Sequence, residues 1–187
     1  MSEQSLQLKR IFPAPSMVTY KRSKNIGDIL IRAKVSSTRR SKRIQEKGKG
    51  FYHCKRACIL CRDSIESTWH ESYHMKKRWN IQAPINCTTE NVIYRLTCKK
   101  CPDFVYIGET KRRFCDRIQD HREAIYQKEL DHPVGAHFNQ PGHTAKDLTP
   151  LAIERVLPRH DTALRKRREK LWINNYGSTI FGSNKKD

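Results

Sequence analysis

The chain has 187 residues, of which 36% are apolar and 30% are charged, and its formal net charge is +19. The low apolar share argues against a large core and predicts that part of the chain is loosely folded. No stretch approaches the ~18 consecutive apolar residues of a membrane span, and the first residues lack the apolar run of a secretory signal. We therefore expect an intracellular protein that does not enter a membrane.

Residues 1–50 form a basic region with 13 Lys+Arg and three acidic residues. Pro13 and Pro15 break any helix there, and residues 35–50 contain almost nothing to bury, so we predict a largely disordered arm and linker. A surface this basic repels itself unless a polyanion binds to it. Nucleic acid is the expected partner and an anionic membrane surface is the runner-up. A basic tail that binds RNA without chemistry is an open alternative.

Residues 51–90 are rich in cysteine and aromatic residues and show weak periodicity, so we expect little core of their own. Intracellular thiols stay reduced, and seven cysteines then favour a metal over disulfides. The spacing suits a structural zinc site that would help the segment to fold, and its four thiolates would be Cys54, Cys58, Cys61 and Cys87. Three histidines could replace the distant fourth thiolate: His53, His70 and His74.

From residue 91 the pattern changes to alternating strands and helices. Residues 92–97 and 104–107 are β-branched and apolar runs, and Pro102 and Asp103 lie between them, which predicts a hairpin. A helix is expected over residues 111–127, where Phe114, Ile118 and Ile125 share one stripe.

The remainder predicts a loop, a third strand and a second helix. Residues 131–149 have turn-forming residues and at most a short helix at 134–138, and residues 151–157 form the strand candidate. The second helix should start near Asp161 or Thr162 and stop at Gly177. Its core-facing side chains are expected to be Leu164, Leu171 and Trp172. The order predicts an α+β fold, in which helices cover a small antiparallel three-stranded sheet.

Two short motifs carry a resemblance to a known family. Val92-Ile93-Tyr94 followed by Tyr106-Ile107-Gly108 resembles the paired signature of GIY-YIG nucleases, with Val92 in place of the family's first glycine. Over residues 91–185 the resemblance implies an endonuclease domain with Mg²⁺ at the family's single glutamate. The catalytic residues that it implies are Tyr94, Tyr106, Arg117, His121, Glu169 and Asn184.

A finer resemblance is to the endonuclease module of Penelope-like retroelements. It rests on Tyr106–Thr110, on the cysteines inside the hairpin, on residues 137–143, and on residues 20–25 and 31–34. In those elements the module follows a reverse transcriptase, which implies a longer polyprotein and a nuclear location. A second zinc site resembling theirs would use Cys98, Cys101, His137 and His143, with His132 as a competitor for either histidine. A redox dithiol, or buried thiols without a ligand role, are the alternatives.

Phosphodiester hydrolysis requires an activated water, charge relief on the phosphate and a stabilised leaving oxygen. One carboxylate, that of Glu169, can hold Mg²⁺, and the planar fork of Arg117 suits a phosphate. Arg117 is expected to favour a phenolate, so that one tyrosine takes the proton of the water and the other orients it. His121, four residues after Arg117, would be a phosphate ligand or a helper base.

Each of these residues also has an explanation without catalysis. The tyrosines could be packing residues, Glu169 could be a solvated partner of Arg165 or Lys166, His121 could be a surface histidine, and Asn184 could belong to a frayed tail. The sequence therefore predicts a metal-dependent DNA nickase of a retroelement, with RNA as a second partner. The alternatives are a zinc-stabilised nucleic-acid-binding module whose nuclease has decayed, and a repair or recombination nuclease of the same fold.

Overall fold

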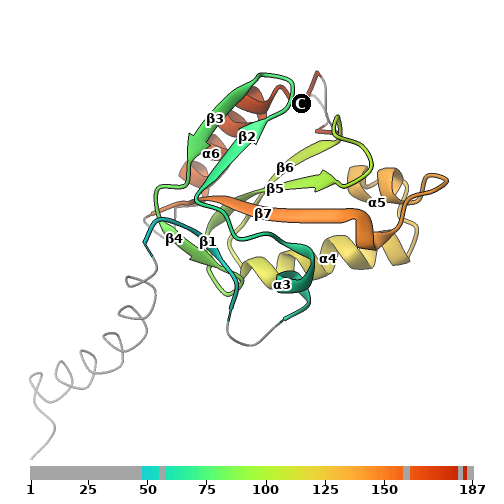
Figure 1. Ribbon diagram of the computed structural model, residues 1–187, viewed down its shortest axis with the longest axis horizontal. Helices are drawn as coiled ribbons and strands as arrows, with labels where there is room; N and C mark the ends of the chain where they lie inside the picture. The colour runs from blue at the N-terminus through green and yellow to red at the C-terminus, as the bar shows by residue number, and fades with distance from the viewer. Residues whose placement is uncertain (1–47, 55–57, 158–160, 181–182, 185–187) are drawn as a thin grey trace, which may run out of the picture. The chain divides into compact units, whose positions relative to one another are not determined.

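The computed structural model describes residues 48–54, 58–157, 161–180 and 183–184, all within a compact unit of residues 41–187 (Figure 1). The basic arm predicted for residues 1–50 therefore lies almost wholly outside the described residues, and it stays a prediction.

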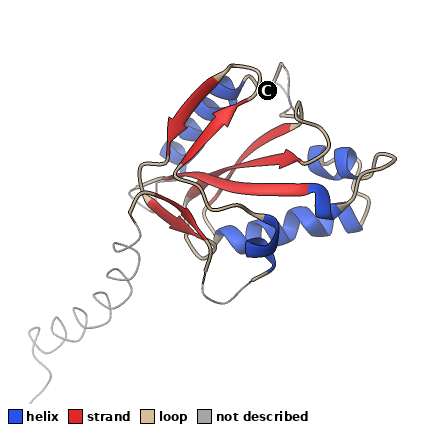
Figure 2. Cartoon of the chain, in the orientation of Figure 1, coloured by secondary structure: helices blue, strands red, loops and turns tan. Residues whose placement is uncertain are grey.

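The centre of this unit is an antiparallel sheet of three strands in the order β6-β5-β7. The strands span Val92–Cys98 (β5), Val105–Thr110 (β6) and Leu148–Arg155 (β7). Residues 92–94 are fully buried in succession, because both faces of the central strand β5 are covered. Helices and strands occur together throughout, which confirms the expected α+β class (Figure 2).

Helices cover the two faces of this sheet. Helix α4 (Phe114–Tyr126) and the short α5 (Pro133–Phe138) lie on one side, and α6 (Thr162–Tyr176) lies on the other (Figure 1). Asp161 caps α6 by accepting a 2.7 Å hydrogen bond from the backbone N–H of Leu164. Gly177 ends the helix in the left-handed region, with φ at 65°.

The expectation for the core face of α6 was wrong at one position. Leu171 is 42% exposed, whereas the adjacent Trp172 is 8% exposed. Successive helical residues point about 100° apart, so Leu171 can project toward solvent while Trp172 packs on the core. Leu164 is partly buried against the core, as predicted.

The segment before the sheet has more core than its sequence predicted. It contains β1 (Gly50–Tyr52), α3 (Ile59–Asp63) and β4 (Pro84–Asn86), with β1 and β4 paired in parallel. The Phe51 ring is fully buried and meets the Phe114 ring of α4 edge-on at 5.8 Å. The core was not apparent from the sequence because each short element contributes only one or two buried side chains, which gives weak periodicity. A domain boundary at residue 90 stays a prediction.

A second hairpin covers the α6 face of the sheet. It consists of β2 (Trp69–Ser72) and β3 (Lys77–Asn80). Its inner rings, His70 and Trp79, pack against Trp172 and Tyr176 of α6. The α6 face is thereby closed by aromatic side chains.

Several element boundaries differ from the prediction, and β6 extends to Thr110 beyond the predicted residue 107. Strand β7 begins at Leu148 rather than at residue 151 and includes Pro150, which an edge strand tolerates because one of its sides needs no backbone donor. Helix α4 begins at Phe114 rather than at residue 111. The predicted loop also contains a 3₁₀ turn, Ala145–Asp147, before β7. Among the described residues, no helix combines the length and apolar content needed to cross a bilayer.

Candidate active site

Two tyrosines lie on the α4 face of the sheet, on neighbouring strands. In the β5–β6 register Tyr94 is opposite Gly108, and Leu96 is opposite Tyr106. Alternate residues of a strand point to the same face, so Tyr94 and Tyr106 project to one side, as the predicted hairpin requires. Tyr94 is fully buried, whereas Tyr106 is only partly buried.

Gly108 is needed at its position because the Tyr94 ring lies over it. A Cβ atom on residue 108 would lie 2.5 Å from the Tyr94 hydroxyl oxygen and 2.6 Å from the ring carbon that carries it. Both distances are shorter than any stable non-bonded contact. The glycine of the second motif therefore makes room for the tyrosine of the first.

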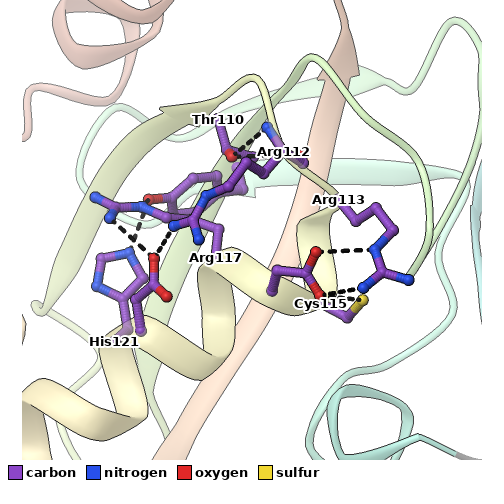
Figure 3. Close-up of polar contacts among 9 residues, drawn as sticks. Thr110, Arg112, Arg113, Cys115, Arg117 and His121 are labelled. Atoms are coloured by element: carbon purple, nitrogen blue, oxygen red, sulfur yellow. Dashed lines mark hydrogen bonds and ion pairs between the residues drawn. The ribbon is translucent and has the colours of Figure 1, made fainter.

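The Tyr94 hydroxyl is held by two side chains of α4. The Nε–H of Arg117 donates to it over 3.0 Å, and the hydroxyl lies 2.7 Å from Nε2 of His121 (Figure 3). Burial, followed by the effects of Arg117 and His132, lowers the pKa of His121 to about 3. Neutral His121 therefore accepts a hydrogen bond from the Tyr94 hydroxyl.

This arrangement contradicts the alternative that His121 is a surface histidine. Its side chain is buried rather than at the surface, and Nε2 is occupied by Tyr94. A buried, neutral imidazole is poorly suited to bind a phosphate. His121 contacts Tyr94, which in turn accepts from Arg117, and its role as a phosphate ligand or helper base stays a prediction.

Arg117 acts on the pKa of both tyrosines in the expected direction, but burial has the larger effect. Burial raises the pKa of Tyr94 well above its ordinary value, and the charge of Arg117 lowers it only in part. The pKa of Tyr106 is likewise raised by burial, with Arg117 acting in the opposite direction. Desolvation outweighs the cation because a phenolate loses much of its hydration at this depth. Both phenols are therefore protonated at neutral pH.

Glu169 approaches the two tyrosines from α6. After burial and the effect of Arg117, the negative charge of Glu169 is a further cause that raises the pKa of both Tyr94 and Tyr106. The helix is anchored one turn earlier by Arg165, which pairs with Glu109 of β6 and donates over 3.2 Å to Asn91. These contacts hold α6 against β6 and thereby place the Glu169 carboxylate within electrostatic reach of the phenols.

Asn184 contacts the backbone of β6 rather than the reactive side chains. Its carbonyl oxygen accepts from the N–H of Ile107 at 2.9 Å, and its amide donates to the carbonyl of Ile107 at 2.8 Å. Strand β6 is at the sheet edge, so this side chain supplies the pairing that a further strand would give. Ile107 lies between Tyr106 and Gly108, so Asn184 supports the position of both motif residues.

His132 also borders the site, although its sequence context suggested only a zinc ligand. It caps α5 by accepting from the N–H of Val134 at 3.3 Å. Its ring centroid lies 5.1 Å from that of His121 and 6.2 Å from that of Tyr106. Pro133 could have indicated this role in the sequence, because a proline at the first position of a helix marks the residue before it as the cap.

The four cysteines of the first predicted zinc site lie together. The ligand atoms of Cys54, Cys58, Cys61 and Cys87 are all within 4.8 Å of one another. Cys61 Sγ is 3.5 Å from two of the other sulfurs and 3.1 Å from that of Cys87. Tetrahedral zinc with Zn–S bonds of about 2.3 Å separates its sulfurs by about 3.7 Å, so the donor set fits such a metal after a small expansion.

The alternative histidines for this site are engaged elsewhere. His53 contacts the carbonyl of Ser64 at 3.0 Å, His70 contacts the Tyr176 hydroxyl at 2.6 Å, and His74 contacts Asp103. Cys87 is therefore the fourth member of the cluster, as predicted.

The second cluster joins the β5–β6 hairpin to α5 and the loop after it. The ligand atoms of Cys98, Cys101, His137 and His143 are within 4.8 Å of one another, and Cys101 Sγ is 3.0 Å from His143 Nε2. Burial, followed by His143, lowers the pKa of His137 to about 4, so its imidazole is neutral. Its buried Nε2 has no hydrogen-bond partner in the described part of the chain. A neutral imidazole with a free nitrogen suits a metal ligand.

Comparisons with known proteins add one structural likeness. No protein-family model matches the chain, and no curated protein matches it. A search of solved structures finds the catalytic domain of the homing endonuclease I-TevI, with a TM-score of 0.44 and 22% sequence identity. The match covers 52% of this chain and 100% of that domain.

Proposed function

We propose that the chain is a DNA endonuclease of the GIY-YIG type that hydrolyses one phosphodiester bond at a time. The observation that carries the proposal is the convergence on Tyr94. The guanidinium of Arg117 donates directly to its hydroxyl, and the charge of Glu169 acts on both Tyr94 and Tyr106. These side chains would supply the two phenols, the guanidinium and the carboxylate that hydrolysis needs.

The side chains divide the chemical tasks according to their burial. Arg117 is partly exposed, and its remaining N–H groups would bind the oxygens of the scissile phosphate. Tyr94 and His121 are buried and hold the plane of that guanidinium. Tyr106 is the phenol with access to solvent, so it would orient the attacking water by a hydrogen bond.

A divalent cation would complete this site. Glu169 is a partly buried carboxylate that acts on both phenols, which fits Mg²⁺ that also binds substrate phosphate and water. When bound, such an ion acidifies water and neutralises phosphate charge. Zinc in the two Cys/His clusters would be structural, and the second cluster would fix α5, which carries His132 at its start.

The biological setting follows from the finer resemblance and from charge. The Penelope-like motifs favour a nickase that opens target DNA for a retroelement, next to a reverse transcriptase portion and in the nucleus. The net charge of +19 favours a polyanionic partner, DNA first and RNA second. Lysine and arginine would contact phosphates without reading the base sequence.

Nicking of supercoiled plasmid in Mg²⁺ tests the proposal. Glu169→Gln and Arg117→Ala are expected to slow nicking by roughly 100-fold or more, because each removes charge stabilisation of the transition state. Two control variants should nick at the parental rate. Glu123→Gln changes an exposed carboxylate of α4, and Arg113→Ala removes an arginine one turn before Arg117.

Each other result points to a different function. Equal nicking by all five proteins would indicate a contaminating nuclease and contradict the proposal. DNA binding without nicking by the parent would support the decayed binding module. A strong preference for branched or damaged DNA over plain duplex would support a repair or recombination nuclease.

A further inference from the structure

Asp120 lies one turn after Arg117 on α4 and contacts two arginines with one carboxylate oxygen. Its Oδ2 is 3.5 Å from Nη1 of Arg117, and the same oxygen accepts a hydrogen bond from Nη2 of Arg112. Arg112 comes from the loop between β6 and α4, and its guanidinium extends toward that of Arg117 (Figure 3). One acidic side chain therefore links a buried network to a cation at the surface.

Arg117 is held at two points by different partners. Its Nε–H donates to Tyr94, and its Nη1 faces Asp120. A guanidinium is planar, so two contacts on separate nitrogens fix both its position and the orientation of its plane. The remaining N–H groups then point in one direction without a further loss of side-chain freedom when a phosphate binds.

Exposure increases outward along this chain of contacts. The side chains of Arg117, Asp120 and Arg112 are 31%, 40% and 55% exposed. The inner arginine is thus set by protein contacts, whereas the outer one is open to solvent. A phosphate that arrives from solvent meets Arg112 first and competes with Asp120 for it.

We propose that Asp120 is a positioning residue that orients Arg117 for the scissile phosphate, and that Arg112 is the cation that first receives this phosphate. The inference rests on the proposed nuclease function. Asp120 also places a negative charge beside the incoming phosphate, which weakens DNA binding. The residue therefore has two opposed effects, since it promotes turnover and reduces affinity.

The same helix contains a matched control pair. Arg113 and Asp116 are also three residues apart and form two hydrogen bonds of 2.8 and 2.9 Å. Their side chains are about as exposed as those of the Arg112–Asp120 pair, but Asp116 pairs with Arg113, whereas Asp120 pairs with Arg117. Replacing either aspartate by asparagine removes one negative charge from the same helix, so only the position differs.

The first experiment measures nicking and DNA affinity for the full chain and for Asp120→Asn, Asp120→Glu and Asp116→Asn. Asp120→Asn is expected to lower kcat roughly tenfold, since a misplaced guanidinium loses its alignment with the phosphate. Its Kd for duplex DNA should fall below that of the parent. Asp120→Glu should recover part of the lost kcat, and Asp116→Asn should keep the parental kcat. Equal kcat in Asp120→Asn and Asp116→Asn would overturn the inference.

The second experiment does not depend on activity. The Nε–H resonance of Arg117 in a ¹⁵N NMR spectrum, assigned with Arg117→Lys, should exchange slowly in the parent and in Asp116→Asn. In Asp120→Asn it should exchange at least about tenfold faster, because one of the two restraints is lost. Unchanged exchange would overturn the positioning role. If the parent fails to nick DNA but exchange responds as expected, the nuclease proposal falls and the positioning role stands.

Discussion

The two faces of the central sheet each bury a tyrosine hydroxyl against a histidine. On the α4 face Tyr94 and His121 are 2.7 Å apart, and on the α6 face Tyr176 and His70 are 2.6 Å apart. Burial lowers the pKa of His121 to about 3 and that of His70 to about 4, with cationic neighbours as the lesser cause. At this level the two pairs are chemically the same.

Their surroundings differ. The Tyr176–His70 pair is enclosed by aromatic rings: His70 stacks on Trp79 at 5.5 Å and meets Trp172 edge-on at 4.9 Å. Each pair has an arginine beside it: Arg117 donates a hydrogen bond to the Tyr94 hydroxyl over 3.0 Å, whereas Arg95 lies over the Tyr176 ring at 6.0 Å and donates to the carbonyl of Glu71. A buried tyrosine–histidine pair is thus a general way to satisfy two polar groups in a core. On the α4 face the pair becomes part of a candidate site because Arg117 donates to its hydroxyl and a second tyrosine, Tyr106, lies 5.6 Å from the His121 ring.

The largest expected effect comes from the metal cluster beside the α4 face. Cys101→Ser should remove one of two bound zinc ions, destabilise the fold by several kcal/mol and reduce nicking, because α5 loses its link to the hairpin. Cys115→Ser, which changes a cysteine outside both clusters, should keep both ions. Zinc analysis of the purified proteins and thermal melting measure this. The same zinc content in both variants would contradict the assignment.

The second prediction separates the two tyrosine–histidine pairs directly. Tyr94→Phe should slow nicking by about 100-fold, since Arg117 loses the acceptor that orients it. Tyr176→Phe should leave the nicking rate unchanged. Each substitution should cost about 1–3 kcal/mol of unfolding free energy, because a buried histidine nitrogen loses its partner. Plasmid nicking measures the activity of the two variants, and urea denaturation measures their stability. Equal nicking rates would contradict the proposed difference between the two faces.

The third prediction concerns the space under Tyr94. Gly108→Ala should destabilise the fold by about 1–3 kcal/mol, because its Cβ would lie 2.5 Å from the tyrosine hydroxyl oxygen. In a Tyr94→Ala background the same change should cost almost nothing. A double-mutant cycle from urea denaturation measures the coupling between the two positions. A coupling near zero would show that Tyr94 does not determine the need for glycine.

The smallest expected effect is a shared pH dependence of stability. Both histidines have folded-state pKa values below the unfolded value of about 6.5, so protonation favours the unfolded chain. The contribution of the two neutral histidines to the free energy of unfolding is complete above about pH 6.5. It is lost as the pH falls toward 3 to 4, by at most about 1.4 kcal/mol per pH unit for each histidine. Urea denaturation at pH 7.5, 6.0 and 5.0 measures how steeply the free energy of unfolding depends on pH. His70→Gln and His121→Gln should each reduce this slope by the same amount. An unchanged slope in either variant would indicate that its histidine is not buried in neutral form.

The sequence by itself determined the features that depend on a few neighbouring residues. The cap at Asp161 and the stop at Gly177 were predicted because each acts on backbone groups within one helical turn. The hairpin around Pro102 and the closely spaced cysteines were predicted because turn residues and ligand spacing are local patterns, whereas His137 and His143 were added by the family resemblance. The placement of the two tyrosines on one side followed from the alternation of side chains along a strand.

Only the tertiary structure decided what each polar group meets. Burial removed His121 from solvent and raised the pKa of the tyrosines, although the sequence had favoured a phosphate ligand and a phenolate. The roles of His132 and Asp120 depend on elements that come together only when α4 and α5 pack on the sheet. The physical reason is that desolvation and charge pairing depend on distance in space, and a linear pattern does not specify which surfaces cover one another.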